Sequence, residues 1–195
     1  MIREGTNRKG LPILTYTRVQ KICIVGNTAS GKSFLAQQAG VALDLPVFHL
    51  DQVYWQEDWS HLSREDFLAC LEELTARAEW VIDGCFSEFG LQGRFAAADA
   101  VVFIDQPSLV CLKRAAARHK TVQEGQPTHA DERKMSWRLS LAFMAEILLF
   151  RLLDRPRIMR AAQRTTACLF VIHEWSEEAQ VLTELAKPEF TKTTD

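Results

Sequence analysis

The residues Lys21 to Ser33, KICIVGNTASGKS, place a short apolar run directly before a loop of glycine and small polar residues. The loop has the spacing G-x-x-x-x-G-K-S, in which glycines let the backbone curl and point several N–H groups at one phosphate. A helix-forming run follows from Lys32 to Leu43, and its N-terminus would add partial positive charge there. The alternative, a chance match in a glycine- and serine-rich turn, is disfavoured by these flanks. The predicted phosphate-binding loop comprises Gly26, Asn27, Thr28, Ala29, Ser30, Gly31, Lys32 and Ser33.

Two side chains of this loop have expected roles of their own. Lys32 would reach the β- and γ-phosphates of a nucleotide, and the Ser33 hydroxyl would ligate Mg²⁺. Such a site also needs a carboxylate for the water shell of the metal, and both Asp83 and Asp105 end apolar runs. Ligands of open α/β sheets bind at these strand ends. Either aspartate could instead cap a helix or a turn.

Five short apolar runs along the chain predict strands. None alternates cleanly with polar residues, and continuous apolar strands are typical of a parallel sheet that is covered on both faces. Helical patterns separate the runs, which gives the β-α-β rhythm of an α/β fold. The predicted strands are Ile22–Val25, Val47–Leu50, Trp80–Ile82, Val101–Ile104 and Leu169–Ile172, and the predicted helices are Lys32–Leu43, Ser63–Ala78, Pro107–His119 and Ser176–Leu185.

The region between the fourth and fifth strands has a different composition. Lys120–Lys134 is polar and predicts a mobile loop, whereas Met135–Leu153 predicts a long apolar helix that Pro156 should break before a further short helix. We therefore predict one domain over residues 1–195, with a core at about 19–118 and 165–187 and a lid and helical insertion at about 119–164. Residues 1–18 and 187–195 are polar and aperiodic, which predicts loose tails.

Composition excludes several classes of protein. The chain has 195 residues, 47% apolar residues, 25% charged residues and a net charge of -2, which fits a single globular domain and no general polyanion binder. Lys113 to Arg164 contains 12 Lys and Arg against 5 Asp and Glu. This local excess favours an anion site, and a solvated basic face is the alternative.

Cysteine usage and the absence of membrane signals predict a cytoplasmic protein. The five cysteines are odd in number and have no C-x-x-C spacing, so we expect reduced, buried thiols. The run Leu139–Leu153 is interrupted by Glu146 and Arg151 and is too short to span a bilayer. The first twenty residues lack the apolar core of a signal peptide.

The segment His49-Leu50-Asp51 follows the second predicted strand and delivers an acid to the same edge of the sheet as the loop. Asp51 could accept the proton of a substrate hydroxyl or orient that hydroxyl toward the γ-phosphate. Tyr54, Trp55 and Trp59 could form the wall of the acceptor site. In the alternative interpretation, Asp51 caps a turn and the aromatic side chains belong to the core.

A set of arginines lies in the basic region. Arg114 and Arg118 are one helical turn apart and share a face, and Arg133 and Arg138 flank the end of the polar loop. Phosphoryl transfer spreads negative charge over the equatorial oxygens, which arginine side chains stabilise. We therefore expect Arg118 and Arg133 to act on the transferring group and Arg114 to contact the nucleotide.

These motifs together resemble the adenylate-kinase-like P-loop proteins, and most of all the group often labelled DNA topology modulation proteins. The resemblance runs from about Lys21 to Leu185. The loop Gly26–Ser33 is generic, whereas the H-L-D-x-x-x-W pattern that begins at His49, taken together with the V-I-D-G pattern that begins at Val81, is more specific. The segment Ala98–Pro107 also matches.

The resemblance implies a three-layer α/β fold with a parallel five-stranded sheet of order 2-3-1-4-5 and a helical lid. It implies ATP and magnesium as cofactors, Asp83 ahead of Asp105 as the carboxylate that supports Mg²⁺, and lid arginines at Arg114 and Arg118. The chain departs from adenylate kinases at Cys85-Phe86-Ser87, where those enzymes carry F-P-R. An AMP-specific kinase is therefore disfavoured.

We expect an ATP- and Mg²⁺-dependent phosphotransferase that acts on a small, unidentified acceptor. The alternative is a nucleotide-gated regulatory ATPase that binds nucleic acid or a protein partner, motivated by the basic region Lys113–Arg164. No G-x-G-x-x-G follows the first strand and no N-K-x-D is present, so dinucleotide enzymes and GTPases are disfavoured. The apolar helix could also form the face of a homodimer.

Overall fold

The computed structural model describes residues 3–6, 12–16, 18–56, 60–123, 141–187 and 190–193. Its main feature is a sheet of five parallel strands in the order β4-β5-β3-β6-β7. Numbered from β3 along the chain, this is the order 2-3-1-4-5, and the predicted fold class is confirmed. The strands are β3 (Lys21–Gly26), β4 (Val47–His49), β5 (Trp80–Asp83), β6 (Ala100–Ile104) and β7 (Cys168–Ile172).

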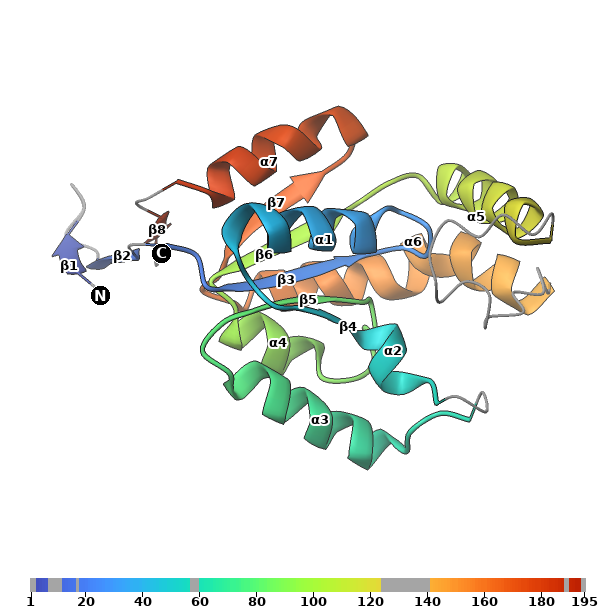
Figure 1. Cartoon of the computed structure of the whole chain (residues 1–195), viewed down its shortest axis with the longest axis horizontal. Helices are drawn as coiled ribbons and strands as arrows, with labels where there is room; N and C mark the ends of the chain where they lie inside the picture. Colours follow the sequence, from blue (N-terminus) through green and yellow to red (C-terminus); the bar gives the residue numbers. More distant parts are fainter. Residues whose placement is uncertain are drawn as a thin grey trace.

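Helices cover both faces of this sheet (Figure 1). On β3, Ile22 and Ile24 point into the core under α1 (Lys32–Leu43) and α7 (Glu178–Leu185). Cys23 and Val25 point to the opposite core. That core is covered by α3 (Arg64–Ala76), α4 (Leu91–Ala97) and α6 (Leu141–Ala162). Because both sets of side chains are buried, the strands read as continuous apolar runs.

The loop Gly26–Ser33 leaves the middle of the sheet at the point where the strand order reverses. From β3 the chain crosses to β4 on one side, and from β5 it crosses back to β6 on the other side of β3. The carboxyl ends of β3, β5 and β6 therefore open toward the same edge. In open α/β sheets this reversal is where ligands bind.

Local sequence explains how the helices begin. α1 has the predicted bounds, and the residue that precedes it, Gly31, has a left-handed φ of 106°. Ser63 caps α3, because its Oγ accepts a hydrogen bond from the Asp66 backbone N–H at 3.1 Å. A short helix, α2 (Leu50–Tyr54), begins directly after His49. Neither α2 nor α4 was predicted.

Two predictions about the later helices are wrong. α5 (Ser108–Gln123) continues past His119, the predicted end. α6 runs unbroken from Leu141 to Ala162 with Pro156 inside it, where a break was predicted. Proline removes one backbone donor and usually kinks a helix. Here burial of Phe150 on one side of the proline and of Ile158 on the other keeps both halves on the same core.

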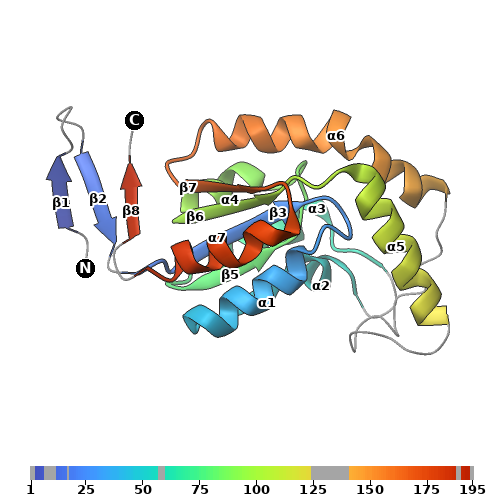
Figure 2. The same ribbon diagram turned by 90° about the horizontal axis from the view of Figure 1, so that it is seen from above.

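The prediction that residues 1–18 and 187–195 form loose tails is also wrong. β1 (Arg3–Thr6), β2 (Pro12–Tyr16) and β8 (Phe190–Thr193) form an antiparallel sheet in the order β1-β2-β8. The two ends of the chain satisfy each other's backbone groups across this ladder. Figure 2 shows this small sheet apart from the five-stranded sheet, beyond the ends where its strands begin.

Several predicted features lie outside the described residues. They are Trp59, Arg133, Arg138 and the first part of the predicted helix Met135–Leu153. No disulfide joins any two of the five cysteines, of which Cys23 and Cys111 are buried and the other three partly buried. Among the described segments, no helix has both the length and the apolar content that crossing a membrane would require.

Candidate functional site

The backbone of the loop Gly26–Ser33 is curled, as the predicted phosphate-binding role requires. Three of its residues have φ values that favour glycine, at 155° for Gly26, 59° for Ala29 and 106° for Gly31. A Cβ atom on Gly26 would lie 2.7 Å from the Ile104 carbonyl oxygen, and one on Gly31 would lie 2.4 Å from the Trp175 ring. The first N–H groups of α1 have no partner within the helix and point out of its N-terminus.

Hydrogen bonds from within the loop hold this curl. The Lys32 ammonium group donates to the Asn27 carbonyl oxygen at 2.8 Å, and the Thr28 N–H donates to Asn27 Oδ1 at 2.8 Å. Asn27 Nδ2 donates to the Ile147 carbonyl oxygen on α6 at 2.9 Å. The Ser30 hydroxyl is buried and has no protein partner. An orphaned hydroxyl beside a lysine fits a loop that receives a phosphate group.

Asp83 joins the loop to the neighbouring strands. It ends β5, is 3% exposed, and accepts a hydrogen bond from the Ser33 hydroxyl at 2.7 Å. Its other carboxylate oxygen lies 2.6 Å from His49 Nδ1. The hydroxyl and carboxylate oxygens of Ser33 and Asp83 are the hard donors that Mg²⁺ prefers, with phosphates completing its shell. The described residues contain no cluster of three His, Cys, Asp or Glu side chains that would enclose a metal alone.

Asp105, the second candidate carboxylate, is occupied by another partner. Arg155 on α6 donates to it through Nε, at 3.1 Å to Oδ1 and 2.9 Å to Oδ2, and Nη2 of the same guanidinium lies 2.9 Å from Oδ2. The aspartate side chain is 1% exposed, so this ion pair is buried on the acidic side. Asp105 therefore ties β6 to α6, and the geometry favours Asp83 as the carboxylate near the loop.

Asp51 lies in the first turn of α2, facing the loop. Its side chain has exposed surface, yet protein atoms surround it closely enough that removal from water raises the pKa of this carboxyl. The charge of Asp83 also raises this pKa, whereas Lys32, His49 and Arg118 lower it. These effects require the charged groups of four different elements to lie near one carboxylate.

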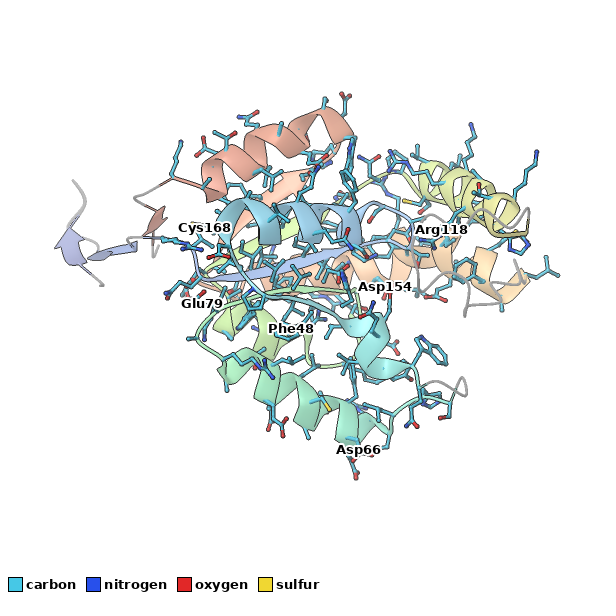
Figure 3. The ribbon with its side chains drawn as sticks, viewed as in Figure 1. Phe48, Asp66, Glu79, Arg118, Asp154 and Cys168 are labelled. Carbon is cyan, nitrogen blue, oxygen red and sulfur yellow. The ribbon has the colours of Figure 1, made fainter. Side chains whose placement is uncertain are left out.

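The predicted arginines are only partly described. Arg118 lies on α5 and acts on Asp51 through its charge. In Figure 3, Arg118 and Asp154 lie toward the end of the sheet where the strands finish, opposite Glu79 and Cys168. Arg114 lies one turn earlier, and its Nη1 donates to the Ser30 carbonyl oxygen at 3.3 Å.

An aromatic cluster lies beside Asp51 and includes two of the three predicted wall residues. Tyr54 stacks on His61 at 5.1 Å and meets Phe86 at 5.1 Å between ring centroids. Trp55 packs edge-on against Tyr54 and remains 40% exposed. Tyr54 is thus part of the core, whereas Trp55 is available to a ligand.

Trp175 was missed as a site residue. Its ring rests on Gly31, lies 5.9 Å from the Phe34 ring, and has the Arg114 guanidinium 5.8 Å from its centroid. A tryptophan after the last strand carries no motif, so only the fold brings it to the loop. It follows β7, which lies on the other side of β3 from β5, the strand that ends at Asp83.

Two carboxylates on α6 were also missed. The pKa of Glu146 is raised by partial removal from water and by the charges of Asp154 and Asp51, and lowered by Lys32. Asp154 accepts a hydrogen bond from the Ser87 hydroxyl and lies 3.6 Å from Arg157. Together with Asp51, these groups make the side of the site away from the loop acidic.

Arg94 supports the turn that follows Asp83. It is 1% exposed and donates to the carbonyl oxygens of Gly84 at 2.8 Å, Cys85 at 2.6 Å and Phe86 at 3.3 Å. The turn needs this support because Gly84 and Phe86 have φ values of 130° and 35°. Burial raises the pKa of the Cys85 thiol to about 11, so Cys85 stays protonated at neutral pH.

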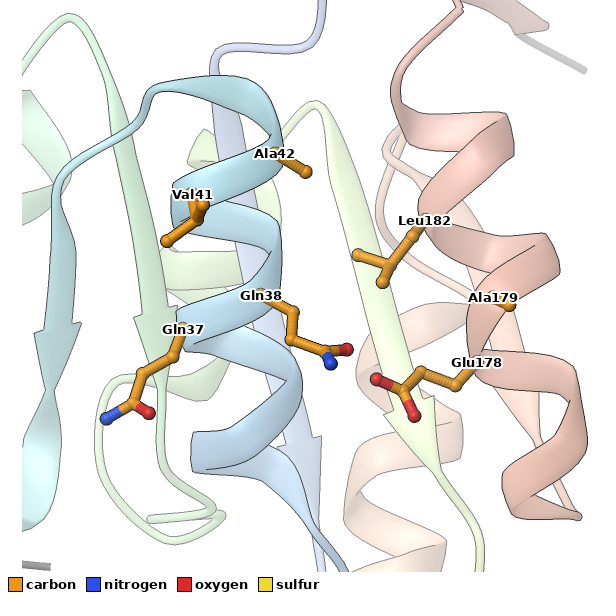
Figure 4. A pocket seen from close by; sticks show the side chains of 7 residues that line it. All are labelled: Gln37, Gln38, Val41, Ala42, Glu178, Ala179 and Leu182. Carbon is orange, nitrogen blue, oxygen red and sulfur yellow. The ribbon is translucent and has the colours of Figure 1, made fainter.

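An open groove of about 570 Å³ lies elsewhere, between α1 and α7 (Figure 4). Val41 and Leu182 line it, and the Glu178 carboxylate points into it. The groove is bordered by the middle and end of α1, away from the loop at its start. No candidate residue for phosphate chemistry belongs to it.

Comparisons with known proteins agree with the fold. The chain is similar to the structure of shikimate kinase from Acinetobacter baumannii in complex with shikimate, with a TM-score of 0.60 and 13% identity over 86% of this chain and 90% of that one. It is also similar to shikimate kinase from Bacteroides thetaiotaomicron, with a TM-score of 0.53 and 16% identity over 86% and 96% of the two chains. A third similar structure is a gluconokinase from Sinorhizobium meliloti 1021, with a TM-score of 0.50 and 17% identity over 87% of this chain and 90% of that one.

No family model and no curated protein sequence matches the chain. Because the identities are below 20%, the similar structures are evidence for the fold alone. The chain therefore has the fold of the P-loop kinases, a five-stranded parallel sheet with a phosphate-type loop after its central strand.

Proposed function

We propose that the protein is an ATP- and Mg²⁺-dependent phosphotransferase whose acceptor is a small molecule with a hydroxyl group. The fold it shares with shikimate kinases and a gluconokinase supports this class of reaction. In this proposal the loop Gly26–Ser33 binds the phosphate donor, and Asp51 lies beside the acceptor.

One observation carries the proposal, namely the electrostatic surroundings of Asp51. Lys32, from the loop, and Arg118, from α5, both lower the pKa of this carboxyl, while Asp83 raises it. A phosphate held by Lys32 would therefore lie near two carboxylates, Asp51 and Asp83. A base, a phosphate clamp and a metal-supporting acid near one point are the parts that phosphoryl transfer needs.

The chemistry follows from these positions. Loop N–H groups, Lys32 and Arg118 would bind the β- and γ-phosphates. Ser33 and Asp83 would hold Mg²⁺, which withdraws charge from the phosphate oxygens. The acceptor hydroxyl oxygen would attack the γ-phosphorus, the bond to the β–γ bridging oxygen would break, and ADP would leave. Asp51 would take the hydroxyl proton, and its raised pKa brings it closer to the neutral range in which a general base is effective.

The nucleotide base would lie on the opposite side of the loop from Asp83. Trp175 and Arg114 offer a ring and a guanidinium plane there, and both stack on aromatic surfaces. Stacking accepts any base, so we expect only a modest preference for ATP over other nucleoside triphosphates. Arg133 remains a predicted ligand of the transferring phosphate.

The test compares Lys32→Ala with Lys113→Ala, an exposed lysine of α5 outside the site. We expect Lys32→Ala to weaken Mg²⁺–ATP binding at least tenfold and to abolish ADP formation, and Lys113→Ala to behave as the wild type. Acceptors are found by ADP release with shikimate, gluconate, nucleosides and nucleoside monophosphates. Unchanged ATP binding and turnover in Lys32→Ala would contradict the proposal.

The alternative, a regulatory ATPase that binds nucleic acid, has less support. Within the described part of the basic region, Arg155 pairs with Asp105, Arg157 pairs with Glu88, and Arg114 contacts the loop. Contacts within the molecule engage these three arginines, although their side chains are at least partly exposed, and this leaves less charge for phosphate backbones. Membership of the DNA topology modulation group stays a prediction. Salt-dependent DNA binding at low ionic strength, unaffected by Lys32→Ala, would favour the alternative.

A further inference from the structure

His49 is the residue opposite Asp83 on the neighbouring strand. In the parallel pairing of β4 with β5, His49 is the register partner of Asp83. The pairing brings His49 Nδ1 to 2.6 Å from Asp83 Oδ1. An ionised carboxylate can only accept hydrogen bonds, so Nδ1 carries the proton in this contact.

The two oxygens of Asp83 thus have different partners. Oδ2 accepts from the Ser33 hydroxyl at 2.7 Å, and Oδ1 accepts from His49. A carboxylate held on one oxygen can still rotate about its Cβ–Cγ bond, whereas partners on both oxygens fix its plane. At 3% exposure, Asp83 has little water to replace a lost partner.

His49 also stands at the start of the segment that carries the proposed base. It is the last residue of β4 and the N-terminal boundary of α2, and Asp51 follows two residues later. The contact between His49 and Asp83 therefore joins the metal side of the site to the acceptor side. The connection runs through hydrogen bonds from Ser33 to Asp83 and on to His49, and then along the chain to Asp51.

We infer that His49 is a positioning residue that orients Asp83 toward the Mg²⁺ of bound nucleotide. This inference rests on the proposed function, since it assigns Asp83 to the metal side. Groups that hold the partners of a metal ion typically change metal affinity 10- to 100-fold when they are removed. In this assignment His49 acts through Asp83.

The test uses three substitutions that treat the Nδ1 position differently. His49→Asn keeps an N–H donor near the place of Nδ1, His49→Gln moves the amide one bond further out, and His49→Ala removes it. ATP binding is titrated at a series of Mg²⁺ concentrations, and the melting temperature without ligand is recorded. His173→Ala is the control, because that side chain is 62% exposed.

We expect His49→Ala and His49→Gln to need about tenfold more Mg²⁺ for half-maximal ATP binding, with ATP affinity at saturating Mg²⁺ within about twofold of wild type. His49→Asn and His173→Ala should behave as the wild type. Should His49→Ala fail to fold, the comparison of His49→Asn with His49→Gln decides alone.

Three results would overturn the inference. The first is a wild-type Mg²⁺ requirement in His49→Gln and, where it folds, in His49→Ala. The second is an equal shift in His49→Asn and His49→Gln, because the place of the donor would then not matter. The third is weaker ATP binding by the same factor at every Mg²⁺ concentration, which marks a merely structural role. Lys32→Ala in the same titration separates the proposals, since wild-type ATP binding there removes the proposed function itself.

Discussion

The proposed role of Asp51 and the surroundings of its side chain favour opposite protonation states. As a proton acceptor it must be ionised near neutral pH, yet its surroundings disfavour the charged form and raise its pKa. Neighbouring Lys32 and Arg118 offset part of this effect. A carboxylate held in this way is a better base than one in water, and it makes the folded protein less stable when ionised.

Removal of this carboxylate should separate binding from chemistry. We expect Asp51→Asn to lower the rate of phosphoryl transfer by about 10²- to 10⁴-fold, the usual range for a general base. ATP affinity should stay within about twofold, because Lys32 and the loop remain. Initial rates with an acceptor from the panel, together with ATP titrations, measure both. A rate within threefold of wild type would exclude Asp51 as the base.

The same substitution should change stability in a pH-dependent manner. An unfolded Asp titrates near 3.8, and the pKa of folded Asp51 is higher. As pH rises above 3.8, the unfolded chain releases its proton first, so the native Asp51 carboxyl progressively destabilises the fold. Asp51→Asn should therefore melt at a higher temperature than wild type at pH 7.5 and at the same temperature near pH 3. An equal difference at both pH values would contradict this explanation.

Gly31 and Gly93 form a matched pair of glycines. A Cβ on Gly31 would enter the Trp175 ring at 2.4 Å from a backbone of φ 106°, whereas a Cβ on Gly93 in α4 meets nothing within 4 Å. Gly31→Ala should weaken Mg²⁺–ATP binding at least tenfold, because the loop must open to admit the methyl group. Gly93→Ala should keep binding and stabilise the fold by about 0.5–1 kcal/mol. ATP titration and urea unfolding measure these effects.

Among the helices, α6 has the most connections to the site. It accepts the hydrogen bond of Asn27 through Ile147, carries Glu146 and Asp154, and holds β6 through the pair of Arg155 and Asp105. In Figure 2 it runs beside α5, which carries Arg118. A shift of α6 would therefore reach both the loop and the acceptor side.

Breaking the ion pair between α6 and β6 tests this role. Arg155→Met leaves the buried Asp105 carboxylate without its partner, which typically destabilises a protein by about 3–5 kcal/mol. The loss of stability should lie near about 3 kcal/mol, because the Arg155 side chain is itself partly exposed. Arg151→Met, on the exposed side of the same helix, should change stability by less than about 0.5 kcal/mol. Equal denaturant midpoints for the two variants would show that the pair contributes nothing.

For the molecule as a whole, nucleotide binding and folding should be coupled. The loop joins β3 to α1, and both lie in the same buried core. A ligand at a hundred times its Kd stabilises the native state by about 2.7 kcal/mol, which corresponds to about 5–10 °C in Tm for a chain of this size. Mg²⁺–ATP should produce this shift in wild type and in Lys113→Ala.

The same shift should fall to about half or less in Lys32→Ala at the same ATP concentration, because a tenfold higher Kd lowers the stabilisation from about 2.7 to about 1.4 kcal/mol. Differential scanning fluorimetry with ATP, with and without EDTA, measures it. A shift of wild-type size in Lys32→Ala would mean that the nucleotide binds elsewhere, for example in the groove between α1 and α7.

Local patterns determined most of the architecture. The apolar runs at β3, β5 and β6 predicted strands buried on both faces, and the spacing from Gly26 to Ser33 predicted a curled loop before α1. These features depend on neighbours within a few residues, so they can be read along the chain. The order of the strands came with the resemblance, and the observed pairing confirmed it.

Only the tertiary structure decided which distant residues meet. The pairing of Asp105 with Arg155, the contact of His49 with Asp83 and the packing of Trp175 on Gly31 join segments about 35 to 145 residues apart. No periodicity specifies such contacts, because they depend on strand register and helix packing. The continuous α6 and the sheet of the two termini have the same origin: burial and cross-strand pairing outweighed the local preferences of Pro156 and of polar tails.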